Sequence, residues 1–245
     1  MKKMFFAILA MQFSLLVFAQ AENPDSTTMI YLTEFRYQSK TVAQKYYPES
    51  RTYWMKNVPE MLDRFSFSSD SRRAYTFSMF RGEKNYGQYI GSRSTINERF
   101  KVEHKEAYEN TISNMIGATT RSSWRVLRDQ SSTEPNWNAN KYNYRKLNIY
   151  TIPHGQYAVF EALLKEIKEY EAKTNRTMNR VILRCVDGYS GNTYMTMLPD
   201  NDVNEFYQHR QARSQNRDAK LTELYDKLYS MITIVRTDDL YRFTF

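Results

Sequence analysis

Apolar and polar positions in the second half of the chain predict strands and helices in a defined order. Lys146–Ile152 mixes apolar and β-prone residues as a strand does, and Pro153–Gly155 turns the chain. From Gln156 onward apolar residues recur at helical spacing, with Lys and Glu on the opposite face. Two strands, Asn179–Asp187 and Asn192–Leu198, follow as a hairpin. The order up to this point is strand, helix, strand, strand.

The remainder of the second half predicts two helices and the closing strands. Asp200 or Asp202 can cap the first of these helices, and a second helix begins at Asp218. Ile232–Arg236 then reads as the fourth strand, and Leu240–Phe245 alternates as a final edge strand would.

The first half predicts the same order with a less regular pattern. The expected elements are a strand at Met29–Tyr37, a helix from about Thr41 to Arg64, paired strands at Ala74–Phe80 and Tyr86–Ile90, a helical region from Ser94 to Ile116, and a fourth strand at Ser122–Arg128.

The two halves are therefore predicted to have the same order of strands and helices. Trp124–Arg128 and Ile232–Arg236 occupy matching places 108 residues apart. The predicted fold class is α+β, with βαββαβ repeats at residues 28–130 and 142–245 and a polar linker at 131–141. Two such sheets packed face to face would close a barrel within a single chain.

The first residues have the pattern of a secretory signal peptide. Lys2 and Lys3 precede an almost wholly apolar run, Met4–Phe18, and Ala19-Gln20-Ala21 supplies small residues for cleavage after Ala21. A membrane anchor is the alternative, but the run is shorter than the ~20 residues that cross a bilayer. We therefore expect residues 1–21 to be removed and the protein to be periplasmic or secreted.

Composition narrows the classes of function. The formal charge is +8, yet Lys and Arg are scattered among Asp and Glu, which favours a solvated basic surface over a nucleic-acid partner. Cys185 is the only cysteine, so no intramolecular disulfide can form, and its apolar surroundings predict a buried thiol. His104, His154 and His209 are too dispersed to predict a metal site.

A strand, a Pro/Gly turn and the helix Gln156–Lys165 resemble the dimeric α+β barrel superfamily, as does Asn192–Pro199 followed by a capped helix. Its members include antibiotic-biosynthesis-type monooxygenases and NIPSNAP-like proteins. The resemblance implies two ferredoxin-like repeats, so that a single chain would form the barrel that two chains form in a dimer. Activities in this superfamily differ widely, from quinol oxidation to haem degradation, and the Asn, Trp and His of the haem-degrading members have no matching positions here. No cofactor is expected.

Arg184 is the first candidate site residue. We expect Val181, Leu183 and Cys185 to lie under the helices, which would turn Arg184 towards the barrel interior. There it could bind an anionic ligand or form an internal ion pair with Glu34, and the ion pair is favoured.

The 20 Tyr, 14 Phe and 3 Trp suggest a second kind of candidate site. Tyr31, Tyr150 and Tyr194, all on predicted strands, could line a cavity for a flat aromatic ligand. More often such residues fill a core or serve an interface.

The leading hypothesis is an exported soluble barrel that binds a small aromatic or anionic molecule, or a partner, without catalysis. The alternatives are a cofactor-independent monooxygenase-like enzyme with an aromatic cavity and an envelope stress or assembly protein with an exposed aromatic patch. An open interior with a group placed for proton transfer would favour the enzyme. A barrel filled by side chains would favour binding at an outer surface or a structural role.

Overall fold

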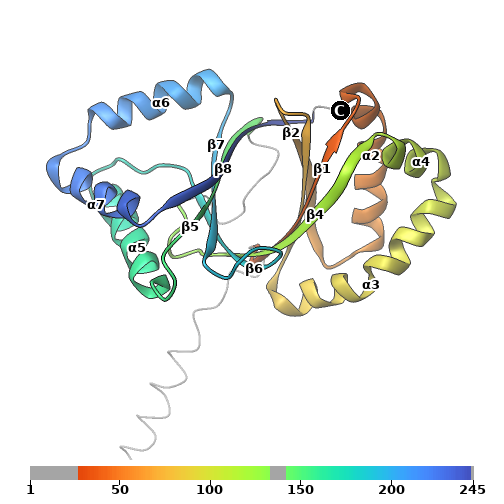
Figure 1. Cartoon of the computed structure of the whole chain (residues 1–245), viewed down its shortest axis with the longest axis horizontal. Helices are drawn as coiled ribbons and strands as arrows, with labels where there is room; N and C mark the ends of the chain where they lie inside the picture. The colour runs from red at the N-terminus through yellow and green to blue at the C-terminus, as the bar shows by residue number, and fades with distance from the viewer. Residues whose placement is uncertain (1–26, 133–141, 244–245) are drawn as a thin grey trace, which may run out of the picture.

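The computed structural model describes residues 27–132 and 142–243, which form one closed barrel of eight strands in the order β1-β3-β2-β8-β5-β7-β6-β4. All the neighbouring strands are antiparallel. Helices cover the barrel on two opposite sides (Figure 1). The predicted signal peptide and most of the predicted linker lie outside the described residues.

The first half contains β1 (Met29–Tyr37), α2 (Lys40–Asn57), β2 (Met61–Ser69), β3 (Arg73–Phe80), α3 (Gly82–Glu103), α4 (Lys105–Ser113) and β4 (Met115–Val126). The second half contains β5 (Tyr144–Thr151), α5 (Tyr157–Lys173), β6 (Val181–Asp187), β7 (Thr193–Asp200), α6 (Val203–Gln215), α7 (Ala219–Ser230) and β8 (Thr233–Arg242).

Both halves have the same strand order. In the first half β4, β1, β3 and β2 lie side by side, and in the second half β8, β5, β7 and β6 do so. The barrel closes because the end of β4 continues onto β6 and the end of β8 continues onto β2. This topology is consistent with two ferredoxin-like repeats and confirms the predicted α+β class.

Alternation along the strands decides which side chains fill the barrel. On β1, Ile30 and Leu32 point inward, whereas Met29 and Tyr31 pack against the helices. The buried apolar residues of the interior are Ile30, Leu32, Phe65, Phe67, Tyr75, Phe77, Met79, Trp124, Leu147, Ile149, Val181, Leu183, Cys185, Met195, Met197 and Leu240. Cys185 is buried as predicted, and burial raises the pKa of its thiol.

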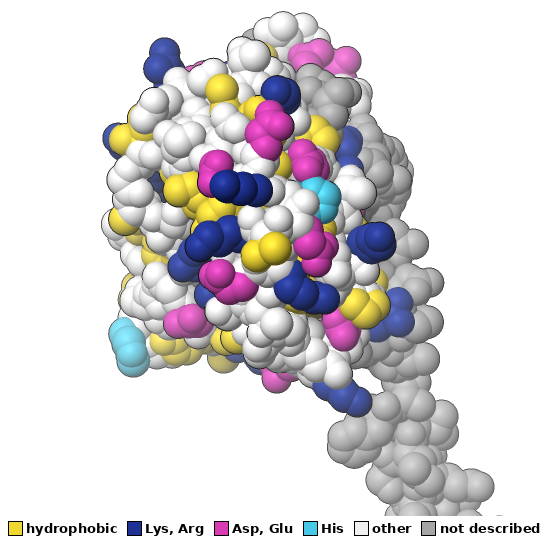
Figure 2. Space-filling model, turned by 90° about the vertical axis from the view of Figure 1, so that its right-hand side faces the viewer, with side chains coloured by type: hydrophobic (Ala, Val, Ile, Leu, Met, Phe, Trp, Pro, Cys, Tyr) yellow, Lys and Arg dark blue, Asp and Glu magenta, His cyan; other side chains and the backbone are white. Residues whose placement is uncertain are grey.

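The helices form two outer layers. The predicted stripe of α5 is buried against the sheet and α7, and consists of Phe160, Leu163, Leu164 and Ile167. Asp202 and Asp218 accept hydrogen bonds from backbone N–H groups in the first turns of α6 and α7, which confirms Asp202 as a predicted cap and the predicted start of a helix at Asp218. Seen from the side of α2, α3 and α4, cationic and anionic side chains are interspersed (Figure 2). No described helix has the length and apolar character needed to cross a membrane.

Two sequence predictions are wrong. Tyr86–Ile90 is part of α3, not a strand, because Tyr89 packs with Tyr31 and Trp54 from a helical face. The partner of β3 is instead β2, with inward Phe65 and Phe67, and the helix predicted to run to Arg64 ends at Asn57 because β2 begins at Met61.

The C-terminal prediction also needs correction. Ile232–Arg236 and Leu240–Phe245 are not separate strands, and the described part of the chain end is not an edge. The single strand β8 pairs with β5 and then with β2, and so closes the barrel.

Candidate functional site inside the barrel

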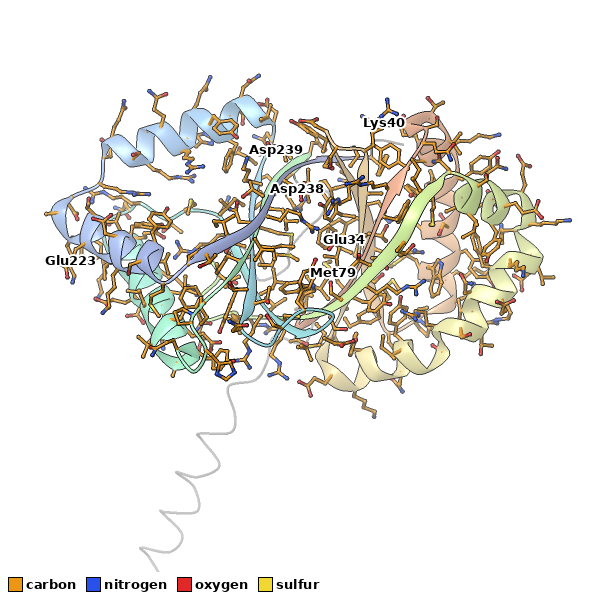
Figure 3. The ribbon with its side chains drawn as sticks, in the orientation of Figure 1. Glu34, Lys40, Met79, Glu223, Asp238 and Asp239 are labelled. Atoms are coloured by element: carbon orange, nitrogen blue, oxygen red, sulfur yellow. The ribbon has the colours of Figure 1, made fainter. Side chains whose placement is uncertain are left out.

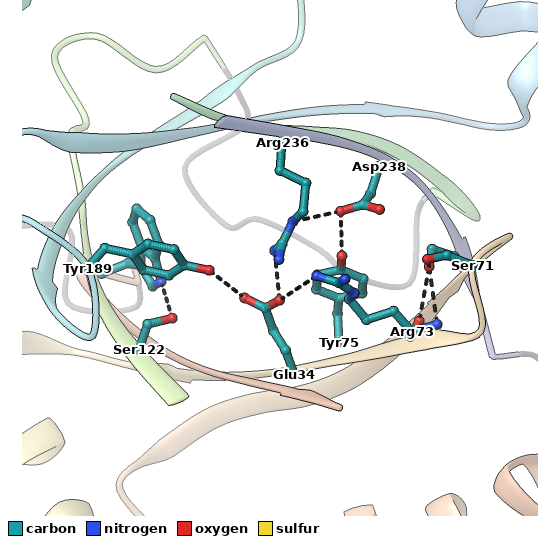
Figure 4. A network of polar contacts seen from close by, with 10 residues as sticks. Glu34, Ser71, Arg73, Tyr75, Ser122, Tyr189, Arg236 and Asp238 are labelled. Atoms are coloured by element: carbon teal, nitrogen blue, oxygen red, sulfur yellow. Dashed lines mark hydrogen bonds and ion pairs between the residues drawn. The ribbon is translucent and has the colours of Figure 1, made fainter. Parts of the chain in front are cut away.

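Glu34 lies inside the barrel at the centre of a network of charged and phenolic side chains (Figure 3, Figure 4). It comes from mid-β1, where alternation turns it inward with Ile30 and Leu32, and its side chain is 3% exposed. Arg236 on β8 donates a hydrogen bond from Nη2 to Glu34 Oε2 at 2.7 Å. Arg73 Nη1 lies 3.8 Å from the same oxygen, and the Tyr189 hydroxyl donates to Oε1 at 3.3 Å.

Asp238 extends this network along β8. Its Oδ2 lies 2.9 Å from Arg236 Nε and accepts a hydrogen bond from the Tyr75 hydroxyl at 2.5 Å. Burial raises the pKa of Tyr75, and its bond to Asp238 raises it further, so this phenol stays protonated. Burial alone would lower the pKa of Arg236, but Glu34, Tyr75, Tyr189 and Asp238 together outweigh burial and raise it.

The network joins the two halves of the molecule. Glu34, Arg73 and Tyr75 come from the first half, whereas Arg236, Asp238 and Tyr189 come from the second. Two carboxylates face two guanidinium groups, so the charges of the network balance. Arg73 and Arg236 each keep 23% of their side chain exposed, which shows that the network reaches solvent at one side.

Arg184 does not take part in this network. Val181, Leu183 and Cys185 face the barrel interior, so Arg184 on the opposite face points to the helix layer, and the predicted orientation of β6 was reversed. Its Nη1 lies 3.0 Å from Glu161 Oε1 on α5. Both faces of β6 are apolar enough to be buried, so the sequence of this strand does not say which face turns inward.

The three tyrosines predicted to line a cavity all pack in the helix layers. Tyr150 and Tyr194 stack with ring centroids 6.1 Å apart, and the Tyr194 hydroxyl donates to Glu161 at 2.8 Å. Tyr31 packs edge-to-face on Tyr89 with centroids 5.4 Å apart. Of the five predicted site residues, only Glu34 reaches the barrel interior.

Sequence reasoning missed the other members of the network. Arg236 and Asp238 alternate with the apolar Leu240 on one strand, and this spacing places all three on one face. Because two separate strands are predicted here from the sequence, with a break between Arg236 and Leu240, that prediction does not place these three residues on one face of a single strand.

A second interior cation, Arg145, was also missed. Its side chain is fully buried, and its guanidinium carbon lies 4.5 Å from the centroid of the Phe67 ring. Burial lowers the pKa of Arg145 to about 9. Because the guanidinium lies against an aromatic face, a cation–π contact offsets part of the desolvation.

The histidines take structural positions. His104 lies 2.5 Å from Glu49, and His209 lies 2.9 Å from Asp200, both through Nδ1. Within residues 27–132 and 142–243, no group of three or more His, Cys, Asp or Glu side chains could hold a metal ion.

Comparisons with known proteins bear on the fold. No protein-family profile matches the sequence, and no curated protein sequence does so. Among solved structures, a candidate monooxygenase from Fusobacterium nucleatum superposes with a TM-score of 0.62 at 12% identity, covering 89% of this chain and 94% of that one. A candidate monooxygenase from Lactobacillus acidophilus gives 0.56 at 11% identity, covering 89% and 95%.

An anthrone oxidase-like protein gives a TM-score of 0.55 at 14% identity, with coverage of 88% and 91%. At such identities the likeness concerns the fold alone, since one fold carries many functions. The chain has the ferredoxin-like α+β barrel fold of these proteins.

Proposed function

We propose that this protein is a non-catalytic binding protein, whose barrel is a packed scaffold and whose ligand binds on the outside of that barrel. The observation that carries the proposal is the balanced network at Glu34. Both oxygens of this carboxylate are engaged within the protein, Oε2 by Arg236 and Arg73 and Oε1 by Tyr189, so its contacts serve the barrel itself. Buried apolar side chains and the fully buried Arg145 fill much of the rest of the described interior.

The direct test is native mass spectrometry of the protein purified from its own cells. The expected result is a small molecule retained at one copy per chain and recovered chemically unchanged. A stoichiometric flavin or haem, or turnover of the retained molecule, would overturn the non-catalytic assignment.

A second candidate is a cofactor-independent oxygenase, supported by the burial of Glu34 between Tyr189 and Arg236 in a fold shared with candidate monooxygenases. In that case Glu34 would accept a proton from a phenolic or anthrone-type substrate. With anthrone as probe we expect no enzyme-dependent oxygen uptake. Uptake that is lost in Glu34→Gln but kept in Glu161→Gln would favour the oxygenase.

An assembly role through an exposed aromatic patch receives less support. Among the described residues the exposed aromatic side chains are Tyr207 on α6 and Tyr229 on α7, each about half exposed. Two tyrosines on different helices make a smaller surface than contact with an unfolded client would use.

We further propose that the chain is exported and that its two halves arose by duplication. Export is supported by the Lys2–Ala21 pattern, and duplication by the shared strand order. The N-terminal residue of the protein recovered from the cell envelope tests export, with Glu22 expected. An intact Met1 on protein in the cytoplasmic fraction would contradict it.

A further inference from the structure

Tyr31 has a polar atom that the surrounding protein leaves unsatisfied. Its side chain is 5% exposed, and its hydroxyl has no hydrogen-bond partner among the described residues. Its cross-strand partner on β4, Ser123, is hydrogen-bonded to the Tyr86 hydroxyl. A buried hydroxyl without a partner destabilises the folded state, so such groups usually have an additional partner in the functioning protein.

Two arginines lie near the Tyr31 side chain. The guanidinium carbon of Arg93 on α3 lies 5.1 Å from the centroid of the Tyr31 ring. Arg121 on β4 pairs with Thr33, and Ser123 pairs with Tyr31, so Arg121 is the diagonal neighbour of Tyr31 on the same outer face. Arg93 of α3 thus packs over the Tyr31 ring, and Arg121 lies on the same outer face of β1 and β4.

These arginines have no acidic partner within the described residues. Neither Arg93 nor Arg121 forms an ion pair there, whereas the nearby Glu83 is bound by Arg125. Burial lowers the pKa of Arg93, and the positive charge of Arg121 lowers it further. Two guanidinium groups that repel each other, here the half-buried Arg93 and the exposed Arg121, are stabilised by an anion between them.

We propose that Arg93, Arg121 and the Tyr31 hydroxyl form a binding site for a small oxyanion, a carboxylate or phosphate group, between α3 and β4. The guanidinium groups supply planar pairs of N–H donors that match either group, and the hydroxyl donates to a remaining oxygen. The Tyr31 and Tyr89 rings pack edge-to-face at the base of the site and hold the hydroxyl in place. The site deepens the proposed function, on which it rests, by naming the ligand class and its place outside the barrel.

Titration calorimetry with inorganic phosphate and with benzoate tests this site and distinguishes the two anions. We expect at least one of them to bind the wild-type protein at one site per chain. Arg93→Gln and Arg121→Gln should each weaken binding by about tenfold or more, and Tyr31→Phe by a smaller factor. Arg99→Gln is the matched control, because Arg99 is an exposed arginine on the same helix, and it should bind as the wild type does.

A second readout does not depend on choosing the right anion. Without ligand, Arg93→Gln should raise the melting temperature, since it removes the repulsion from Arg121, and Arg99→Gln should not. Equal weakening of binding by Arg99→Gln, or no binding together with an unchanged melting temperature in Arg93→Gln, would overturn the site.

The two proposals fail separately. A retained ligand found by native mass spectrometry that still binds Arg93→Gln would sink the site and leave the binding function intact. Turnover of a substrate with phosphate still bound at Arg93 would contradict the non-catalytic function and leave the oxyanion site intact.

Discussion

The two halves of the barrel have the same strand order but differ in what they place inside. Glu34 on β1 and Ile149 on β5 hold equivalent positions, since each lies two residues after an inward leucine and just before the irregularity in its ladder with the fourth strand. By the same register, Thr120 is the equivalent of Arg236. The first half thus has the acid Glu34 where the second half has the aliphatic Ile149. The second half has the cation Arg236 where the first half has the neutral Thr120.

The comparison extends to the neighbouring positions. Ser122 is the equivalent of Asp238, and Met195 is the equivalent of Tyr75. Neither half contains the whole network. Glu34 of the first half makes its shortest contact to an arginine with Arg236 of the second half, so this contact forms only when the barrel closes. The polar network inside the barrel therefore joins two unlike halves and is not a property of either half alone.

The largest expected effect comes from making the first half resemble the second. Glu34→Ile gives β1 the side chain that β5 has and leaves Arg236 and Arg73 without their shared carboxylate. We expect the free energy of unfolding to fall by about 3 kcal/mol, near the lower end for a broken buried pair because Arg236 keeps Asp238 and some solvent. Urea denaturation measures it.

The matched control for this variant is Ile149→Val at the equivalent position, with an expected loss of about 1 kcal/mol. A loss in Glu34→Ile no larger than that in Ile149→Val would mean that the two positions are energetically alike.

A smaller effect should be similar in both halves. Burial raises the pKa of Tyr89 in the first half and of Tyr150 in the second, each to about 12. A phenol whose pKa is higher in the folded than in the unfolded state contributes stability that is complete below pH ~10 and is lost as pH rises towards ~12, at about 2–3 kcal/mol per residue. Alkaline unfolding followed by phenolate absorbance should therefore begin near pH ~10.

Tyr89→Phe and Tyr150→Phe should each make the free energy of unfolding depend less steeply on pH in this range. A stability that does not change between about pH 9 and about pH 11 would contradict the burial of both phenols.

The smallest effect concerns the neutral counterpart of Asp238. The Trp124 indole donates a hydrogen bond from Nε1 to Ser122 Oγ at 2.8 Å, and both residues are buried. Ser122→Ala should cost about 1 kcal/mol, because it leaves the indole N–H unsatisfied. Ser113→Ala, at an exposed helix end, should be close to neutral in the same thermal unfolding experiment. Equal costs would show that the buried bond contributes nothing.

The sequence predicted the second half better than the first for a physical reason. The helix α5 has a regular apolar stripe, so periodicity alone identifies it. In α3 the packing residues Tyr89, Ile96 and Phe100 are spread among glycines and polar residues, and the local pattern around Tyr86–Ile90 mimics a strand. Tertiary packing decides such segments, and a single sequence does not contain it.

The candidate site was predictable only in part. Glu34 was identified because an acid in the middle of an apolar strand must be paired if it is buried. Its partner was assigned to Arg184 instead of Arg236, because the choice depends on which face of β6 turns inward and on the register of β8. Both are decided when the barrel closes, which brings together Glu34 and Arg236, 202 positions apart in the chain. A local sequence pattern does not contain that information.

The most direct test of the seam is a double-mutant cycle between Glu34→Ile and Arg236→Thr, which places at each position the residue of its counterpart in the other half. If the network joins the repeats, the two substitutions together should cost less than the sum of their separate costs, with a coupling of about 1–3 kcal/mol in the free energy of unfolding. A coupling of zero within about 0.5 kcal/mol would contradict the account, because it would mean that the contact between Glu34 and Arg236 does not stabilise the association of the two halves.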